Sequence, residues 1–311
     1  MSSSSSVQTS MAAWTGSGAL ARKWLFWAAA ALTALVFALI SLGGLVRNEG
    51  AGLACPDWPL CFGQVVPPMD YQVFLEWFHR LIAGTVSVFL LALSTVVFFI
   101  PQLRSKVWKF CAFALSLLAA QVVLGGMTVL GLLDPKWVSS HLAVGLAFFG
   151  TILWLTLRLG EGAEQKTRPL VSTRLRNFGV FTTTVLYAQI LLGGLVSSNF
   201  AGLACAGFPT CNGEWLPPLE GLVGFQVVHR IGALVTTLLV LGFSFALWRA
   251  ATSARTKFVS IALPLLVVTQ VILGASSVLF GLPLLVSVAH LSTATALLGA
   301  LLVSLYELKY A

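Results

Sequence analysis

Eight long apolar stretches constrain the fold of this chain more than any other feature. Each is at least as long as the roughly 20 residues that an α-helix needs to cross a bilayer. The stretches are continuous, whereas the strands of a membrane β-barrel are short and alternate in hydrophobicity. Hydrophobic residues form 58% of the 311 positions and charged residues only 9%, a balance that soluble globular domains do not show. The sequence therefore predicts an all-α membrane protein with eight transmembrane helices, at about 24–46, 73–99, 107–132, 137–158, 176–198, 224–248, 257–281 and 283–306.

The basic residues indicate how these helices are oriented. Fourteen of the eighteen Lys and Arg residues lie at one set of helix ends, and the exceptions are Arg47, Arg80, Lys136 and Arg230. Cytoplasmic loops are enriched in Lys and Arg, so we expect a multi-pass protein of the bacterial plasma membrane with both termini in the cytoplasm. The net charge of +8 then reports topology, and we expect membrane lipid as the partner, with no nucleic acid.

The chain contains two copies of one four-helix unit. The matching segments, at offsets of 149 or 150 residues, are 42–46 with 192–196, 51–55 with 201–205, 79–80 with 229–230, 121–125 with 270–274, and 141–142 with 290–291. An even number of helices gives both copies one orientation, so we expect two parallel-oriented four-helix bundles related by a pseudo-two-fold axis. The predicted divisions are a disordered cytoplasmic tail at 1–22, an N-terminal repeat at 23–159, a cytoplasmic linker at 160–175 and a C-terminal repeat at 176–311.

Pairs of small residues lie toward the outer end of each odd-numbered helix. Such residues let a neighbouring helix, or a flat ligand, approach the backbone closely, and both explanations account for them equally well. The pairs are Gly43-Gly44, Gly125-Gly126, Gly193-Gly194 and Gly274-Ala275.

Two outer loops each carry a Cys-x5-Cys motif. Cys55 and Cys61 lie in the first loop, and Cys205 and Cys211 lie at the matching positions of the second. The charge pattern places both loops outside the cytoplasm, where thiols tend to be oxidised, so we expect a disulfide within each loop. Cys111 lies in a helix toward the cytoplasmic side, and we expect an ordinary buried thiol there.

The four histidines of the chain all fall on even-numbered helices near the outer face. Each repeat has two of them, His79 with His141 and His229 with His290. Zinc or copper sites need three or four ligands, whereas two imidazoles can bind a haem iron from opposite faces. A di-iron site with Glu-x-x-His motifs fails because no carboxylate besides Glu76 lies within the predicted spans. Two such pairs, with apolar surroundings, predict two haem sites.

The residues that flank His79 and His229 differ between the repeats in one respect. Arg80 and Arg230 follow the histidines in both copies, and we expect them to anchor haem propionates or to reach lipid headgroups. Glu76, however, is replaced by Gln226. A carboxylate at Glu76 either orients His79 by a hydrogen bond or handles protons and stabilises positive charge at a reacting group. Because glutamine cannot take a proton, we expect the chemistry in the N-terminal repeat.

Together, Glu76-x-x-His79-Arg80, His141, His229-Arg230, His290 and the two Cys-x5-Cys loops resemble the haem A synthase family over residues 24–307. The resemblance implies oxidation of the C8 methyl group of haem O to a formyl group, which gives haem A for terminal oxidases. It implies that His229 and His290 bind a haem b cofactor, while His79 and His141 bind the substrate haem beside the catalytic acid Glu76. It also implies a Cys55–Cys61 disulfide that matters for activity, a second disulfide at Cys205–Cys211, haem O synthase as the supplier, and a homo-oligomer. The electron donor does not follow from it.

Two other functions fit parts of the same pattern. A two-haem, bis-histidine electron-transfer cytochrome linked to quinol explains the four histidines but gives no purpose to the difference between Glu76 and Gln226. A transporter with parallel repeats makes the histidines substrate contacts.

Overall fold

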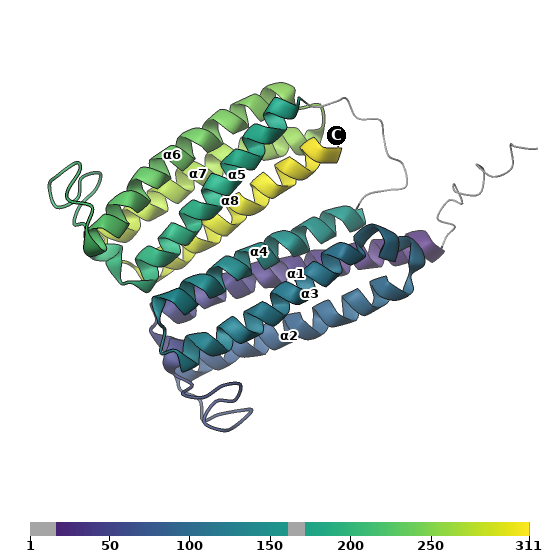
Figure 1. Cartoon of the computed structure of the whole chain (residues 1–311), viewed down its shortest axis with the longest axis horizontal. Coiled ribbons are helices and arrows are strands. Elements are labelled where there is room, and N and C mark those ends of the chain that lie inside the picture. The colour runs from purple at the N-terminus through teal and green to yellow at the C-terminus, as the bar shows by residue number, and fades with distance from the viewer. Residues whose placement is uncertain (1–16, 161–171, 311) are drawn as a thin grey trace, which may run out of the picture.

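The computed structural model describes residues 17–160 and 172–310, and Figure 1 shows their arrangement. All eight α-helices in these two segments are long and apolar enough to cross a membrane, which confirms the prediction of an all-α, multi-pass membrane protein. The elements are α1 (Ser17–Asn48), η2 (Ala51–Leu53), α2 (Tyr71–Phe99), α3 (Pro101–Leu130), α4 (Pro135–Gly160), α5 (Thr173–Ser198), η3 (Ala201–Leu203), α6 (Gly221–Ala250), α7 (Ala254–Leu279) and α8 (Leu284–Tyr310).

Several helices extend beyond the apolar stretches that predicted them. α1 begins at Ser17, so residues 17–22, predicted as part of a disordered tail, are helical. α3 begins at Pro101, where the missing N–H of proline is not needed. Its first turns carry basic residues, so the apolar stretch begins only after them. Most of the predicted linker and tail, residues 161–171 and 1–16, lies outside the described residues.

The helices α1–α4 and α5–α8 form two bundles, which lie side by side (Figure 1). In the first bundle α2 packs on α1 and α3, and α4 packs on the same two helices, so α2 and α4 face each other across the bundle diagonal. In the second bundle α6 and α8 face each other across α5 and α7 in the same way. The loops that contain η2 and η3 project from the same end of the two bundles (Figure 1).

Helices α1, α4, α5 and α8 form the contact between the bundles, and the contact is reciprocal. A Cβ added at Gly44 would meet the side chain of Leu291, and one added at Gly194 would meet Leu142. Gly44 matches Gly194 in the repeat, and Leu142 matches Leu291. Reciprocal contacts of this kind are what a two-fold axis between equivalent units produces. They are compatible with the predicted pseudo-symmetry.

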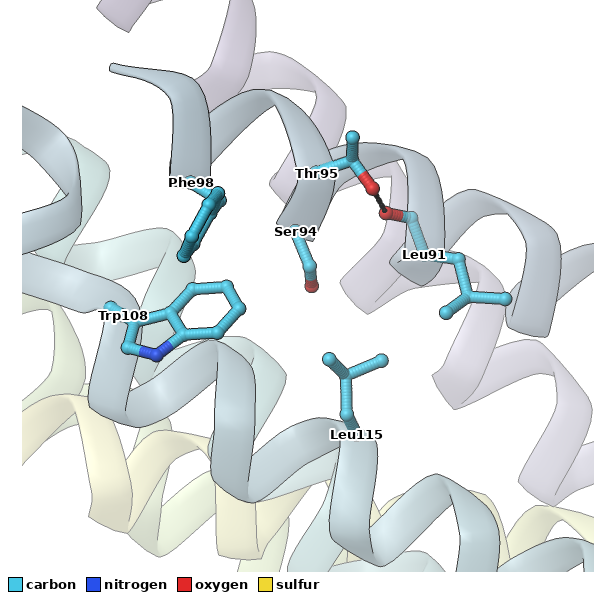
Figure 2. Close-up of a pocket in the computed structure, with 6 residues that line it drawn as sticks. All are labelled: Leu91, Ser94, Thr95, Phe98, Trp108 and Leu115. Atoms are coloured by element: carbon cyan, nitrogen blue, oxygen red, sulfur yellow. Dashed lines mark hydrogen bonds between the residues drawn. The ribbon is translucent and has the colours of Figure 1, made fainter. Parts of the chain in front are cut away.

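A pocket between α2 and α3 lies far from the outer loops. It is lined by Leu91, Ser94, Thr95, Phe98, Trp108 and Leu115, whose side chains Figure 2 shows. Ser94 is fifteen residues beyond His79 on α2, which places it roughly 22 Å along the helix at 1.5 Å per residue. This pocket is therefore separate from the histidines. Cys111, on α3, is buried and free, as predicted.

Candidate haem sites

The structure groups the four histidines into the two predicted pairs. His79 on α2 is near enough to His141 on α4 for their charges to interact, and His229 on α6 relates to His290 on α8 in the same way. The helices of each pair are diagonal to one another in their bundle. Among the described residues no group of three or more His, Cys, Asp and Glu side chains forms a metal site. Each bundle thus offers two imidazoles that come from opposite sides of its interior.

Every histidine ring packs edge-on against a glycine of the neighbouring odd-numbered helix. A Cβ placed on the glycine would lie 2.9–3.3 Å from Cε1 of the ring, where real Cβ contacts are rare. Each pair of small residues contributes its first glycine to this contact. The four contacts are Gly43 with His79, Gly125 with His141, Gly193 with His229, and Gly274 with His290. The glycines therefore let the imidazoles lie directly against a helix backbone.

These features fit a haem with two axial histidines. A buried polar atom normally has a hydrogen-bond partner, yet Nδ1 is buried without one in His79, His141 and His290. Imidazoles arranged in this way on diagonal helices form a donor set of two nitrogens per bundle, which suits an iron porphyrin and is too small for a structural zinc ion. The residues present thus fit the group that the sequence pattern predicts.

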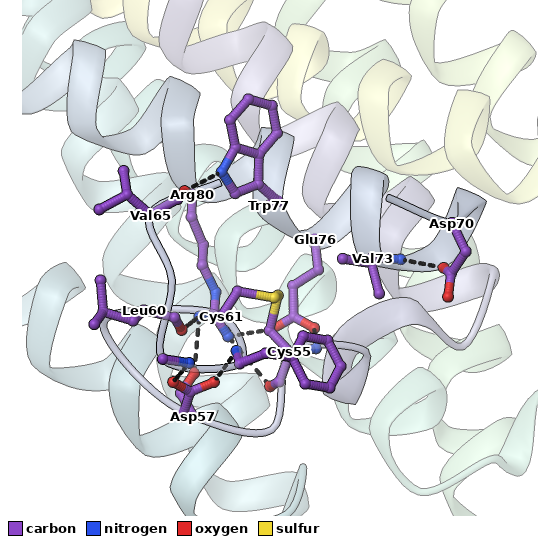
Figure 3. The surroundings of a disulfide bond; sticks show 12 residues. Cys55, Asp57, Leu60, Cys61, Val65, Asp70, Val73, Glu76, Trp77 and Arg80 are labelled. Atoms are coloured by element: carbon purple, nitrogen blue, oxygen red, sulfur yellow. Dashed lines mark hydrogen bonds and ion pairs between the residues drawn. A yellow bond between two sulfur atoms is a disulfide. The ribbon is translucent and has the colours of Figure 1, made fainter. Parts of the chain in front are cut away.

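Glu76, buried one turn from His79, is bonded to the first disulfide loop. One carboxylate oxygen accepts a hydrogen bond from the backbone N–H of Cys55 at 2.8 Å, and the other pairs with Arg80 Nη2 at 2.5 Å (Figure 3). The hydrogen bonds found for this carboxylate do not include His79. Glu76 thus connects the helix that carries His79 to the backbone of the Cys55–Cys61 loop.

Arg80 holds the same loop from the other side of the carboxylate. Its Nη1 donates to the carbonyl oxygens of Asp57 at 2.9 Å and Leu60 at 2.6 Å, and Nη2 lies 3.5 Å from the carbonyl oxygen of Cys55. Arg80 is therefore largely engaged by protein groups. Its predicted role as a propionate anchor stays a prediction.

The C-terminal repeat keeps the arginine clamp but not the acid. Arg230 donates to the carbonyl oxygens of Thr210 at 2.8 Å and Cys205 at 3.2 Å, the positions that match Leu60 and Cys55. Gln226 is buried like Glu76, but its amide donates to the carbonyl oxygen of Gly202 at 2.9 Å. A carboxylate that accepts from a loop amide is thus replaced by an amide that donates to a loop carbonyl.

Both predicted disulfides are present, Cys55–Cys61 and Cys205–Cys211. Each second cysteine begins a tight turn, which places Phe62-Gly63 or Asn212-Gly213 at positive φ. Asparagine and glycine tolerate this conformation, whereas phenylalanine does not favour it.

In the first loop, Asp57 stabilises the unfavourable turn conformation of Phe62. The two carboxylate oxygens of Asp57 accept from the N–H groups of Phe62 at 2.6 Å and Gly63 at 2.8 Å. The Gly63 N–H, the Phe62 N–H and the nearby charge of Arg80 hold the pKa of this exposed carboxyl below its ordinary value. In the second loop a side chain of the turn itself stabilises the loop, because Asn212 accepts a hydrogen bond from the N–H of Ala206 at 2.9 Å.

The first loop also covers the outer end of α3. The indole of Trp58 packs on Gly126, where an added Cβ would lie 3.1 Å from the ring. The matching positions in the C-terminal repeat hold Phe208, a smaller ring, and Ala275, a larger side chain. The volume lost from Trp58 to Phe208 is thus offset by the volume gained from Gly126 to Ala275.

Three glutamines that the sequence analysis did not connect with the sites contact histidines. Each lies four residues before one of the glycines that packs on an imidazole, so it is one helical turn away on the same face. Gln121 donates to the carbonyl oxygen of His141 at 2.8 Å, Gln270 lies 3.3 Å from Nε2 of His290, and Gln189 contacts His229 at two atoms. The common spacing was the signal that could have identified them.

Glu76 is the only carboxylate within the predicted spans, but the membrane-spanning helix α8 carries a second one beyond the predicted end of its apolar stretch. α8 continues to Tyr310, and Glu307 near its end is buried and paired with Arg255 at 3.0 Å. The apolar stretch stopped before this residue, although the helix does not. Glu307 lies seventeen residues beyond His290, roughly 26 Å along α8, so it has no part in the histidine sites.

Comparison with known proteins agrees with the geometry. The sequence model of the COX15-CtaA family, described as cytochrome oxidase assembly proteins, matches residues 23–302. The chain belongs to this family. Among similar proteins, one named heme A synthase from Shewanella oneidensis is 32% identical over 88% of this chain and 94% of its own length. Proteins of the same name from Alkalihalophilus pseudofirmus and Shouchella clausii are 31% and 30% identical, over 86% and 78% of this chain and 91% and 83% of their own lengths.

The COX15-CtaA match spans both repeats. It contains the four histidines, Glu76 and both disulfide loops, so every part of the two sites lies in the matched region. The family membership and the site geometry therefore concern the same residues.

Proposed function

We propose that the protein is a haem A synthase, an oxidoreductase that converts the C8 methyl group of haem O into a formyl group. The observation that carries the proposal is the contrast between two otherwise matched sites. Both bundles have diagonal histidines packed on glycines and an arginine that holds a disulfide loop, but only the N-terminal site has a buried carboxylate. The names of the relatives at about 30% identity support the same activity.

The two repeats then have different tasks. In the N-terminal repeat, residues 23–159, His79 and His141 would bind the substrate haem O. In the C-terminal repeat, residues 176–311, His229 and His290 would bind haem b as a resident cofactor, which supplies one-electron transfer when it is bound. Conversion of a methyl to a formyl group removes four electrons from the carbon and adds one oxygen atom from water or dioxygen, so an external electron acceptor is needed, and a second redox centre in the same chain could pass the electrons on one at a time.

Glu76 is the residue that we assign to the chemistry. Removal of electrons from a methyl carbon builds up positive charge and releases protons, and a carboxylate can stabilise the first and accept the second. Its hydrogen bonds to Cys55 and Arg80 hold it in one position one turn from His79. Gln226 can neither stabilise positive charge in this way nor accept a proton, which suits a site that only transfers electrons.

The setting of the reaction follows from the same assignment. We infer that both termini face the cytoplasm and that both haem sites and disulfide loops lie toward the outer face, in accord with the position of the two loops at one end of the bundles (Figure 1). Haem O synthase would supply the substrate. Arg80 and Arg230 as propionate anchors, and a homo-oligomeric state, are further parts of this proposal.

Expression in a bacterium that makes haem O but lacks haem A tests the proposal. Chromatography of the extracted haems should show haem A only when this chain is present. His79→Ala with His141→Ala should abolish haem A while the purified protein keeps haem b, and the matched pair at His229 and His290 should lose haem b.

The same experiment separates the alternatives. A quinol-linked two-haem cytochrome would carry haem b in both sites and leave haem O unchanged. A protein that is purified without any haem would contradict both of these functions and leave the transporter.

A further inference from the structure

The two histidines that match in the repeats, His79 and His229, differ in how their imidazoles are held. The side-chain amide of Gln189 on α5 lies 2.9 Å from Nδ1 of His229 and donates to the His229 carbonyl oxygen at 2.8 Å. Nδ1 of His79 is buried and has no hydrogen-bond partner in the described part of the chain. One ring is therefore fixed at its second nitrogen, and the other is not.

The difference is encoded by two pairs of residues. Gln189 lies against Gly232 on α6, and a Cβ at position 232 would collide with the amide oxygen of Gln189. At the matching positions of the N-terminal repeat the chain has Leu39 on α1 and Ile82 on α2. The amide and the glycine that makes room for it are thus both replaced by aliphatic side chains. The hydrogen bond and the space that it needs are thus present together in one repeat and absent together from the other.

The contact of Gln189 with Nδ1 matters for a metal ligand. A histidine that binds a metal through one ring nitrogen almost always uses the other nitrogen in a hydrogen bond, which fixes the ring and strengthens the bond to the metal. A histidine that binds a metal through Nε2 carries its proton on Nδ1, so the Gln189 amide, turned by 180°, would accept from Nδ1–H in exchange for its bond to the His229 carbonyl oxygen. Gln121 and Gln270 do not contact the Nδ1 atoms of His141 and His290. Gln189 is thus the one glutamine of the three with this contact.

We propose that Gln189, together with Gly232, is the positioning residue that keeps haem b bound permanently, and that Leu39 and Ile82 make His79 the exchangeable ligand of the substrate site. The inference rests on the proposed function, since it assumes that the histidine pairs bind haem. It explains how two closely related sites in one chain serve opposite needs. A product must leave the N-terminal site after each reaction, whereas a cofactor must stay in the C-terminal site.

Exchange of the two pairs of residues between the repeats tests this proposal. The full-length protein is purified with bound haem, reduced with dithionite and mixed with carbon monoxide, which binds ferrous haem only as fast as an axial histidine dissociates. Wild-type protein should bind carbon monoxide in a fast phase from the N-terminal site and a slow phase from the C-terminal site. Loss of a second hydrogen-bond partner typically weakens metal binding on the order of 10- to 100-fold. Gln189→Leu with Gly232→Ile should accelerate the slow phase by a similar factor, and Leu39→Gln with Ile82→Gly should slow the fast phase.

Assignment of the phases comes from variants that lack one histidine pair. His79→Ala with His141→Ala should remove the fast phase, and His229→Ala with His290→Ala the slow one. Gln189→Glu, which keeps an acceptor for an Nδ1–H group, should retain slow binding with an unchanged low-spin spectrum, whereas Gln189→Leu should not. This distinguishes positioning of the ring from a general effect on packing.

Three results would overturn the proposal: equal carbon monoxide kinetics in the two sites, no change in either exchange variant, or equal acceleration by Gln189→Glu and Gln189→Leu. Failure to form haem A would contradict the proposed function alone, because the binding kinetics are measured without turnover. Absence of haem from both sites would overturn both.

Discussion

Gly193 lies directly against the imidazole of His229, so that a Cβ atom at Gly193 would be 2.9 Å from Cε1 of the ring. The same relationship recurs in all four histidines, so each ring position requires a glycine on the neighbouring helix. The methyl group of alanine would push the ring away from its position. The first glycine of each small-residue pair thus makes room for a histidine ring.

We predict that Gly193→Ala lowers the haem b content of the purified protein by at least about tenfold, the lower limit for disturbance of a ligand's support. Pyridine haemochrome spectra measure this content. Gly125→Ala should have a weaker effect at its own site, because its Cβ would lie 3.3 Å from the His141 ring.

Gly84→Ala is the matched control for these substitutions. It also lies within a helix, but no atom is close enough to meet an added Cβ there. Its haem content should equal that of the wild type. A loss of haem in Gly84→Ala as large as in Gly193→Ala would contradict the contact as the cause.

The contact between Trp58 and Gly126 predicts a rescue. Gly126→Ala should lower the thermal midpoint of the detergent-solubilised protein, since overpacking a fitted site costs about 1–3 kcal/mol. Trp58→Phe in the same chain should restore most of the loss, because the C-terminal repeat already combines Phe208 with Ala275. Additive effects of the two substitutions would show that the two side chains do not interact.

The arginine clamp predicts a change in the first disulfide loop. Arg80→Lys keeps a positive charge but loses the planar fork that reaches the carbonyl oxygens of Asp57 and Leu60. The Cys55–Cys61 disulfide should then be reduced several-fold faster, as measured by alkylation and mass spectrometry. The Cys205–Cys211 disulfide of the same molecule is the internal control, and equal acceleration of both would refute a local effect.

The pH dependence of the two loops should differ. The lowered pKa of Asp57 means that its contribution to loop stability is complete above the ordinary pKa of about 4 and is lost as the pH falls through the lower folded value. Asn212, which holds the second loop, does not titrate. Reduction by a phosphine should therefore become faster for Cys55–Cys61 than for Cys205–Cys211 below about pH 4. Asp57→Asn should remove this dependence, and a pH profile common to both disulfides would argue against the assignment.

Much of the fold could be predicted because hydrophobicity alone determines which segments enter a membrane. The ends of the helices could not be predicted in this way. α3 begins before Arg104 and α8 continues past Glu307, and charged residues of this kind lie outside the apolar stretches that hydrophobicity identifies. The pairing of Cys55 with Cys61 followed from short spacing, which leaves few alternatives.

The contacts of the site were harder to predict than its members. Spacing places both His79 and Arg80 within a turn of Glu76, and only the folded loop decides that the carboxylate pairs with Arg80 and Cys55. Gln189 was missed because its counterpart is Leu39, so the repeat did not reveal it. Contacts between helices depend on rotation about the helix axis, which a single sequence does not determine.

The difference between Glu76 and Gln226 is the central claim, and exchange of these two residues tests it most directly. Haems extracted from cells that supply haem O would be separated by chromatography for Glu76→Gln, for Gln226→Glu and for the wild type. Loss of a group that transfers protons in the reaction typically slows it by about 10²–10⁴-fold. We predict that Glu76→Gln makes almost no haem A while it keeps its haem b, and that Gln226→Glu still makes haem A. Full production of haem A by Glu76→Gln would contradict the account.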